Sequence, residues 1–114
     1  MSDCIFCKIG SKQIQAMLVY EEDDLMAFRD INPQAPVHVL IIPKKHITSM
    51  NDFEPADMEL VGKMFAAAKH IAKQEKISGS GYRVVMNTGG HGGQSVGHVH
   101  LHLLGGRQLG WPPG

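Results

Sequence analysis

The chain has 114 residues, of which 43% are hydrophobic, and this size and composition are typical of one folded domain with a single core. Eleven lysine and arginine residues balance eleven aspartate and glutamate residues, so the formal net charge is zero with neutral histidines. A chain without a basic excess lacks the electrostatic footprint of a general nucleic-acid binder, and no DNA or RNA partner is expected.

The first residues lack the features of a targeting segment. Met1 to Cys7 contain no basic stretch followed by an apolar core, which argues against a secretory signal. No apolar run in the chain is long enough to span a bilayer, so no membrane association is expected. We therefore expect a cytoplasmic protein, in which Cys4 and Cys7 favour metal binding or redox chemistry over a disulfide.

The N-terminal half predicts a short helix and three strands. Residues 4–9 are expected to form a helical turn, because Cys4, Cys7 and Lys8 have helical spacing. Short strands are expected over 17–21 and 25–29, joined by an acidic turn. Residues 37–43 are rich in β-branched side chains and predict a central strand that ends at a proline.

The C-terminal half predicts one long helix, from about Pro55 to Lys76, followed by two strands over 82–87 and 96–104. A proline in the first turn, early carboxylates and late lysines suit the helix dipole. Antiparallel strands with one long helix on a face define an α+β fold of about five strands. The predicted apolar stripe of the helix consists of Val61, Met64, Phe65, Ala68, Ile71 and Ala72.

The segment His98-Val99-His100-Leu101-His102 carries the strongest functional signal. In a strand alternate side chains share a face, so the three imidazoles are expected on one side, about 6.6 Å apart. A neutral imidazole can attack phosphorus, and neighbouring imidazoles can hold phosphate oxygens. The pattern favours phosphate chemistry; a structural metal site and a chance arrangement are the alternatives.

The glycine-rich loop before this segment is a candidate anion site. Glycines let backbone N–H groups approach an anion, and Asn87 and Ser95 at its ends add side-chain donors. The simpler alternative is a hairpin connection between two strands.

Cys4 and Cys7 form a Cys-x-x-Cys pair, for which His46 and His98 are candidate completing ligands. Two thiolates and two imidazoles suit tetrahedral zinc, and a closed set of four makes the metal structural. The alternative is that both cysteines are small core residues.

Three further residues have an ordinary structural interpretation beside a functional one. His38, among valine and isoleucine, would usually be a core residue. Asp30 can accept hydrogen bonds from ribose hydroxyls, but a turn residue is the commoner role. Trp111 would usually pack, and can dock on a neighbouring subunit.

The sequence resembles the histidine triad (HIT) family, and within it the Hint branch of purine nucleoside phosphoramidate hydrolases. The resemblance rests on His-x-His-x-His followed by two leucines, on the Gly105-Gly106-Arg107 and Trp111-Pro-Pro-Gly endings, and on segments 28–38, 42–47 and 92–95 in the family's order. It implies one HIT domain over residues 1–114, with an antiparallel sheet of about five strands, one long helix and a short N-terminal helix. The sheet would continue across a homodimer.

The resemblance also implies the site. His100 would be the nucleophile that takes the nucleotidyl group, with His38 beside it positioning its ring. Catalysis would further involve His102 and Ser95, and Asp30 would bind the ribose. The α-phosphate would be held by His102, Asn87, Gly93 and Ser95, and the purine by an apolar slot of Phe6, Ile9, Ile14, Phe28 and Ile31, with Trp111 reaching toward the partner's site.

The implied activity is hydrolysis of AMP-amine phosphoramidates through a nucleotidyl-histidine, with a structural Zn²⁺ at Cys4, Cys7, His46 and His98 and no cofactor needed for the reaction. Three alternatives are weighed. The first is a nucleotide-binding regulatory module with little turnover. The second, a catalytic zinc site made by the three histidines, lacks a flanking carboxylate base. Cleavage of dinucleoside polyphosphates is disfavoured because Gly105-Gly106-Arg107 replaces the proline-arginine ending of the Fhit branch.

Overall fold

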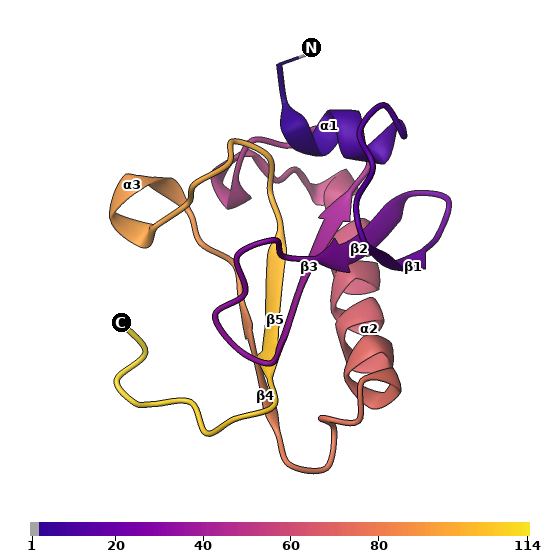
Figure 1. The fold of residues 1–114 in the computed structure, drawn as a ribbon. Coiled ribbons are helices and arrows are strands. Elements are labelled where there is room, and N and C mark those ends of the chain that lie inside the picture. The colour runs from indigo at the N-terminus through magenta and orange to yellow at the C-terminus, as the bar shows by residue number, and fades with distance from the viewer. Residues whose placement is uncertain (1–2) are drawn as a thin grey trace.

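The computed structural model describes residues 3–114 and contains one antiparallel sheet of five strands in the order β1-β2-β3-β5-β4 (Figure 1). Met1 and Ser2 lie outside the described residues. The prediction that Met1 to Cys7 contain no secretory signal falls partly on these two residues. β3 is central, as its β-branched composition predicted. The strands are β1 (Leu18–Glu21), β2 (Leu25–Arg29), β3 (Val37–Pro43), β4 (Tyr82–Val85) and β5 (Leu101–Gly105).

The long helix α2 (Met58–Gln74) follows a 3₁₀ turn, η2 (Pro55–Asp57), so the prediction of a helix over 55–76 is confirmed to within two residues at its end. Glu54 and Asp57 form a capping box at its start. The stripe that α2 buries is Met64, Ala67, Ala68, Ile71 and Ala72.

The predicted stripe was wrong at Phe65, whose surface is 49% exposed, and it omitted Ala67. Val61 is only half-buried. The apolar spacing of the sequence fits two overlapping faces, and packing on the sheet selects the one centred on Met64, Ala68 and Ile71. Phe65 lies about 100° further round the helix, since each residue advances the helix by that angle.

The two faces of the sheet carry different cores because side chains alternate along each strand. On β3, Val39 and Ile41 pack with α2, whereas Leu40 and Ile42 pack with the short helix α1 (Ile5–Gly10). On β5, Leu101 and Leu103 belong to the α2 core. His102, between these two leucines, therefore lies on the face that α1 covers.

Strand β5 begins at Leu101 and not at residue 96, so His98 and His100 lie in the segment that leads into it. Continuing the β3–β5 register would place Val99 opposite Pro43, which has no N–H to donate. The Val99 N–H instead donates to the carbonyl of Ile47, at 2.7 Å. The β3–β5 ladder therefore ends at the pair Ile41–Leu101, before β3 itself ends at Pro43.

The connection between β4 and β5 also differs from the prediction. β4 ends at Val85 and not at Asn87, and the glycine-rich segment forms a short helical turn, α3 (Gly89–Gly92). A second short 3₁₀ turn, η1 (Met50–Asp52), lies between β3 and α2. None of the helices in residues 3–114 combines the length and the apolar character that crossing a membrane requires.

Candidate functional site

The histidine segment places His98 and His100 in the interior, and His100 and His102 line a cavity. His98 and His100 are 0% and 3% exposed, and His102 is half-buried. The His100 and His102 ring centroids lie 4.9 Å apart, and Phe6 of α1 packs edge-on against both His98 and His100. The predicted alternation is observed within β5, where His102 lies between Leu101 and Leu103 of the opposite core; His98 and His100 precede the strand.

One hydrogen bond defines the tautomer of His100. Its Nδ1 lies 2.8 Å from the buried main-chain carbonyl oxygen of His98. A carbonyl only accepts, so Nδ1 carries the proton, and Nε2 of the neutral ring keeps a free electron pair. A nucleophilic imidazole needs this arrangement.

A chain of hydrogen bonds likewise orients His38 and His102. The backbone N–H of Gln34 donates to Nδ1 of His38 at 3.0 Å, which leaves the His38 proton on Nε2. That Nε2 donates to Nδ1 of His102 at 2.9 Å and lies 3.4 Å from an Asp30 carboxylate oxygen. His102 consequently carries its proton on Nε2. The resemblance implied that His38 lies beside His100; in the structure the His38 imidazole contacts the His102 ring, which in turn contacts the His100 ring.

The charge states of these rings follow from their burial. Burial, and then the neighbouring imidazoles of His100 and His38, lower the pKa of His102 to about 4. Burial also lowers the pKa of His38, against the opposing charge of Asp30. Both rings are therefore neutral at physiological pH, in agreement with the tautomers that the hydrogen bonds require.

A cavity of about 330 Å³ lies beside these rings, between α1, the segment that follows it and the sheet. It brings together most of the residues predicted to form the nucleotide site. They are Phe6, Ile9, Ile14, Phe28, Asp30, Ile31, Ser95, His100 and His102.

Several residues that line the cavity were not predicted from the sequence. Leu40 could have been found, because it shares a strand face with His38. Val96 lies next to the predicted Ser95. No sequence signal pointed to the others, because their position depends on how the segment around α1 folds back over the sheet. They are Ile5, Gln15, Ala16, Met17 and Arg29.

Three of the residues predicted to bind the nucleotide, Asn87, Gly93 and Trp111, do not line this cavity. Continuing the β4–β5 register places Asn87 opposite His100. The Gly93 N–H donates to the carbonyl of Gly90 at 3.1 Å, so an anion there would compete with that bond. Trp111 is 82% exposed in the C-terminal segment, away from its own chain's cavity.

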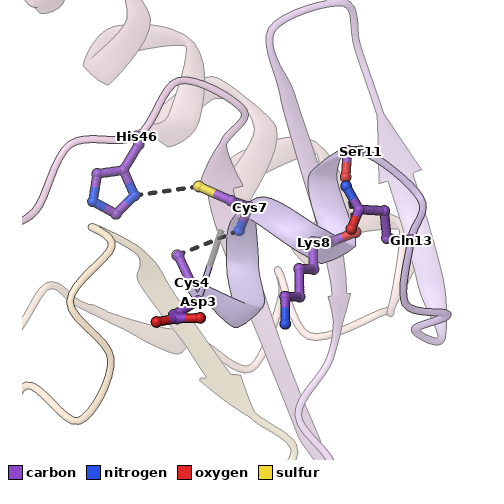
Figure 2. Close-up of a pocket in the computed structure, with 7 residues that line it drawn as sticks. All are labelled: Asp3, Cys4, Cys7, Lys8, Ser11, Gln13 and His46. Carbon is purple, nitrogen blue, oxygen red and sulfur yellow. Dashed lines mark hydrogen bonds between the residues drawn. The ribbon is translucent and has the colours of Figure 1, made fainter. Parts of the chain in front are cut away.

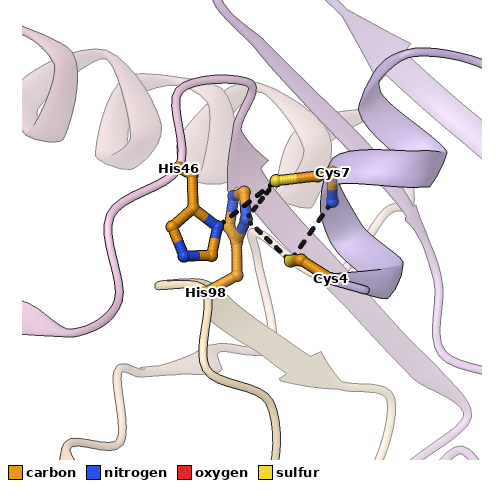
Figure 3. A group of neighbouring side chains, drawn as sticks. All are labelled: Cys4, Cys7, His46 and His98. Atoms are coloured by element: carbon orange, nitrogen blue, oxygen red, sulfur yellow. Dashed lines mark hydrogen bonds between the residues drawn. The ribbon is translucent and has the colours of Figure 1, made fainter. Parts of the chain in front are cut away.

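A second cluster joins Cys4, Cys7, His46 and His98 (Figure 3). Cys4 caps α1 and Cys7 lies one turn later, whereas the histidines come from the loop after β3 and from the segment before β5. One ligand atom from each of the four lies within 4.8 Å of the others. The pairing predicted from the Cys-x-x-Cys spacing and the resemblance is present.

The donor atoms of this cluster fit a tetrahedral metal. The Nδ1 of His98 lies 3.3 Å and 3.6 Å from the sulfurs of Cys4 and Cys7, and the Nδ1 of His46 lies 3.2 Å from that of Cys7. Ligands at zinc distances are separated by about 3.3–3.8 Å in a tetrahedron. His98 Nε2 donates to the carbonyl of Pro43 at 2.8 Å, which leaves Nδ1 free for a metal. The four residues can therefore hold Zn²⁺.

The cluster of possible metal ligands and the cavity lie on different sides of α1. A hollow of about 730 Å³ runs from Cys4, Cys7 and His46 along the helix to Lys8 and Gln13 (Figure 2). It shares no lining residue with the cavity that contains His100 and His102. The helix thus separates a solvent-facing cluster of possible metal ligands from a more enclosed site of imidazoles.

Alternate histidines that enter an antiparallel strand beside a cavity, under a short N-terminal helix, are the arrangement that the sequence resemblance implied. The HIT domain model matches residues 11–109, and the chain belongs to the HIT family.

Similar proteins come from bacteria, plants and fungi. The chain is 54% identical to a HIT family hydrolase from Legionella pneumophila, with a TM-score of 0.97 over 98% of this chain and 100% of that one. A 14 kDa zinc-binding protein from Zea mays is 52% identical over 99% of this chain and 89% of its own length. Adenylylsulfatase HINT1 from Arabidopsis thaliana is 48% identical over 99% of this chain and 78% of its own length.

Proposed function

We propose that this HIT domain, spanning residues 1–114, is a nucleotide hydrolase that cleaves purine nucleoside 5′-monophosphoramidates through a nucleotidyl intermediate on His100. The observation that carries the proposal is the bond from His100 Nδ1 to the His98 carbonyl, because it leaves Nε2 as a nucleophile at the cavity. The hydrolase and adenylylsulfatase relatives support a reaction at a nucleotide phosphate. We assign the protein to the cytoplasm, as its sequence predicts.

In the first step, Nε2 of His100 attacks the α-phosphorus, and the bond from phosphorus to the amine breaks. The departing amine takes up a proton, and we assign Ser95, on the cavity wall, to that side of the phosphate. In the second step, water attacks the phosphorus and loses a proton to solvent, the bond from phosphorus to Nε2 of His100 breaks, and the nucleotide leaves. Dividing the displacement in this way replaces one difficult step by two easier ones.

The other imidazoles serve the phosphate. His102, with its proton on Nε2, can donate to a phosphoryl oxygen as negative charge develops there. His38 acts one ring further back, since its bond to His102 fixes the tautomer that makes this donation possible. Asn87, which follows β4 near its pairing with His102, and the backbone near Gly93 complete the proposed phosphate site.

The nucleoside would occupy the apolar part of the cavity. Phe6 and Phe28, whose rings pack edge to face with their centroids 5.6 Å apart, lie near the base position together with Ile9, Ile14 and Ile31. One oxygen of Asp30 accepts from the backbone N–H of Asn32 at 2.8 Å, which fixes the carboxylate within a turn. Its other oxygen faces His38 and is the group we assign to the ribose hydroxyls.

We further propose that Cys4, Cys7, His46 and His98 bind a structural Zn²⁺, as the name of the Zea mays relative supports. When bound, the ion would supply a cross-link between α1, the loop after β3 and the histidine segment. A closed set of two thiolates and two imidazoles leaves no open coordination position for chemistry. The proposed reaction therefore involves no metal at the phosphate.

The alternative of a catalytic zinc held by the histidines is less well supported. The Nδ1 atoms of His98 and His100 have different partners, a pair of sulfurs and a carbonyl. Asp30, His38 and His102 also bring ligand atoms within 4.8 Å. However, the Gln34 N–H on His38 Nδ1 keeps a proton on Nε2, so that trio forms a hydrogen-bond chain.

We also propose that the protein is a homodimer in which the sheet continues from one subunit to the other. β4 is an edge strand with one unpaired side, and such an edge is a template for a second copy of the chain. Phe65 on α2 and Trp111 in the C-terminal segment are large exposed apolar residues that a partner could cover.

Turnover of a fluorogenic AMP-amine phosphoramidate by wild type and His100→Ala, each with and without a strong chelator, tests the proposed function. We expect activity that survives the chelator and is lost in the variant. AMP binding without wild-type turnover would favour the regulatory binding module. Activity lost on chelation, with the fold retained, would favour the catalytic zinc site.

A further inference from the structure

The side chain of Gln94 bonds to three separate backbone positions. Its Oε1 accepts from the N–H of Gly89 at 3.0 Å, and its Nε2 donates to the carbonyls of Thr48 at 2.7 Å and Val96 at 3.0 Å. An amide nitrogen has two hydrogens, so both are used. The amide end of the Gln94 side chain is thus fixed. In the chain, Gln94 lies between Gly93 and Ser95, the two residues that the proposed function assigns to the phosphate.

Both the main chain and the side chain of Gln94 form hydrogen bonds that close the glycine-rich loop. Its backbone N–H donates to the carbonyl of Gly89 at 3.1 Å, while its Oε1 accepts from the N–H of the same glycine. Gly89 and Gly93 both have positive φ, at +74° and +86°, so the loop uses conformations that glycine adopts freely. A loop of this composition loses much conformational freedom when it is ordered, and the Gln94 amide supplies bonds that hold it in one shape.

The same side chain joins the loop to the histidine segment. Thr48, whose carbonyl accepts from Gln94, follows Ile47, whose carbonyl accepts from the N–H of Val99 at 2.7 Å. Val99 lies between His98 and His100. One amide group therefore fixes the distance between the proposed phosphate-binding loop and the backbone that carries the nucleophile.

We propose that Gln94 is a positioning residue for the phosphate: it holds Gly93 and Ser95 in place relative to His100 without touching the substrate. The proposal rests on the proposed function. Groups that stabilise developing charge are effective when they are already in position, and a misplacement of about 1 Å can cost on the order of 100-fold in rate.

Two variants of different chemistry test this role. Gln94→Glu has the same length and keeps an acceptor for Gly89, but its carboxylate would face the Thr48 and Val96 carbonyls with no hydrogen to donate. Gln94→Met removes all three bonds at similar volume. Gln74→Met is the matched control, because the Gln74 side chain makes one bond of 3.4 Å, on α2, to the carbonyl of Val19.

The readouts are phosphoramidate turnover, AMP binding and ¹⁵N relaxation of the Gly93 and Ser95 amides. We expect both Gln94 variants to lower kcat about 10- to 100-fold with a smaller change in KM, and to lower the order parameters of these two amides. The control should match wild type in all three. The melting temperature is recorded to separate loop order from global stability.

A lower melting temperature with unchanged loop order and unchanged kcat would overturn the proposal, as would failure of both variants to fold, since Gln94 would then serve the fold as a whole. If wild type shows no turnover, the proposed function fails. In that case the role of Gln94 is decided, without turnover data, by whether its variants change the order parameters of the loop and the affinity for AMP.

Discussion

The backbone carbonyl of His98 accepts the hydrogen bond that sets the tautomer of His100, while the side chain of His98 faces Cys4 and Cys7. Two sites are therefore built on one residue, the main chain serving the proposed nucleophile and the imidazole serving the cluster of possible metal ligands. Anything that moves His98 changes the position of the acceptor for His100. Phe6 strengthens this link, because it comes from the helix of the two cysteines and packs on both histidine rings.

Removing the proposed zinc should lower stability more than it alters the chemistry. Cys4→Ser should reduce zinc from near one per chain to well below one and lower the free energy of unfolding by about 2–5 kcal/mol, since ligand binding to the folded state is lost. Metal analysis and urea unfolding with and without chelator would measure both. Wild type that unfolds identically with and without chelator, at well under one zinc per chain, would contradict the assignment.

Phe6→Ala should weaken both the fold and nucleotide binding. The Phe6 ring is 6% exposed and contacts Phe28, His98 and His100, so its removal should cost about 3–5 kcal/mol in the free energy of unfolding. The Kd for AMP should rise at the same time, because the ring lines the cavity. Urea unfolding and calorimetric titration would measure the two effects, with half-buried Phe53, which is not among the lining residues, as the control. Unchanged AMP affinity in folded Phe6→Ala would contradict its place at the base.

Stability should fall as the pH is lowered from about 6.5 to about 4. The pKa of His102 is about 4 in the folded protein against 6.5 for an ordinary histidine, so within this range the unfolded chain binds more protons. The contribution is complete above pH 6.5 and is lost progressively below it, with an upper limit of about 3 kcal/mol. His38 acts in the same direction, because its pKa is also lowered.

Urea unfolding at a series of pH values would measure this effect in wild type and in His102→Asn. The variant should show a shallower dependence of the unfolding free energy on pH between 4 and 6.5. Equal slopes for the two proteins would mean that His102 is not a buried neutral ring.

Trp111 should act on the partner's site, since it is 82% exposed in its own chain. Trp111→Ala should form dimers but show a lower kcat/KM. Mixed with His100→Ala, it should regain activity, because a heterodimer then contains one site with both His100 and the partner's tryptophan. Only monomers in sedimentation at micromolar concentration would contradict the proposed dimer, and dimers that show no gain on mixing would contradict the placement of Trp111 at the partner's site.

Local patterns were enough to predict the main elements. The β-branched run at 37–43 and the apolar spacing of 55–76 gave a central strand and a helix that the structure confirms. The start of β5 could not be predicted in this way, because it depends on the β3–β5 register and on where that ladder ends, at the pair Ile41–Leu101. The exposure of Phe65 likewise follows from which helix face meets the sheet.

In the candidate site, too, some residues have a local sequence signal and others are placed by contacts between distant segments. Cys-x-x-Cys and the alternating histidines are local signals; the donor set of a zinc site made His46 a candidate ligand, and the family resemblance connected His38 with His100. The contact of His38 with His102 spans 64 residues of sequence and depends on the pairing of β3 with β5. The bond from Gln94 to the carbonyl of Thr48 also joins two segments that are 46 residues apart in the chain, so no local pattern singles this residue out.

The most direct test of the proposed chemistry is detection of the intermediate. Wild type mixed with an AMP-amine phosphoramidate, quenched within one turnover and digested, should yield one AMP group on the peptide that contains residues 98–102, located on His100 by fragment masses. The same peptide from His100→Ala should be unmodified. A wild-type enzyme that turns over substrate with no adduct on His100 at any quench time, or with an adduct on another residue, would contradict nucleophilic catalysis by His100.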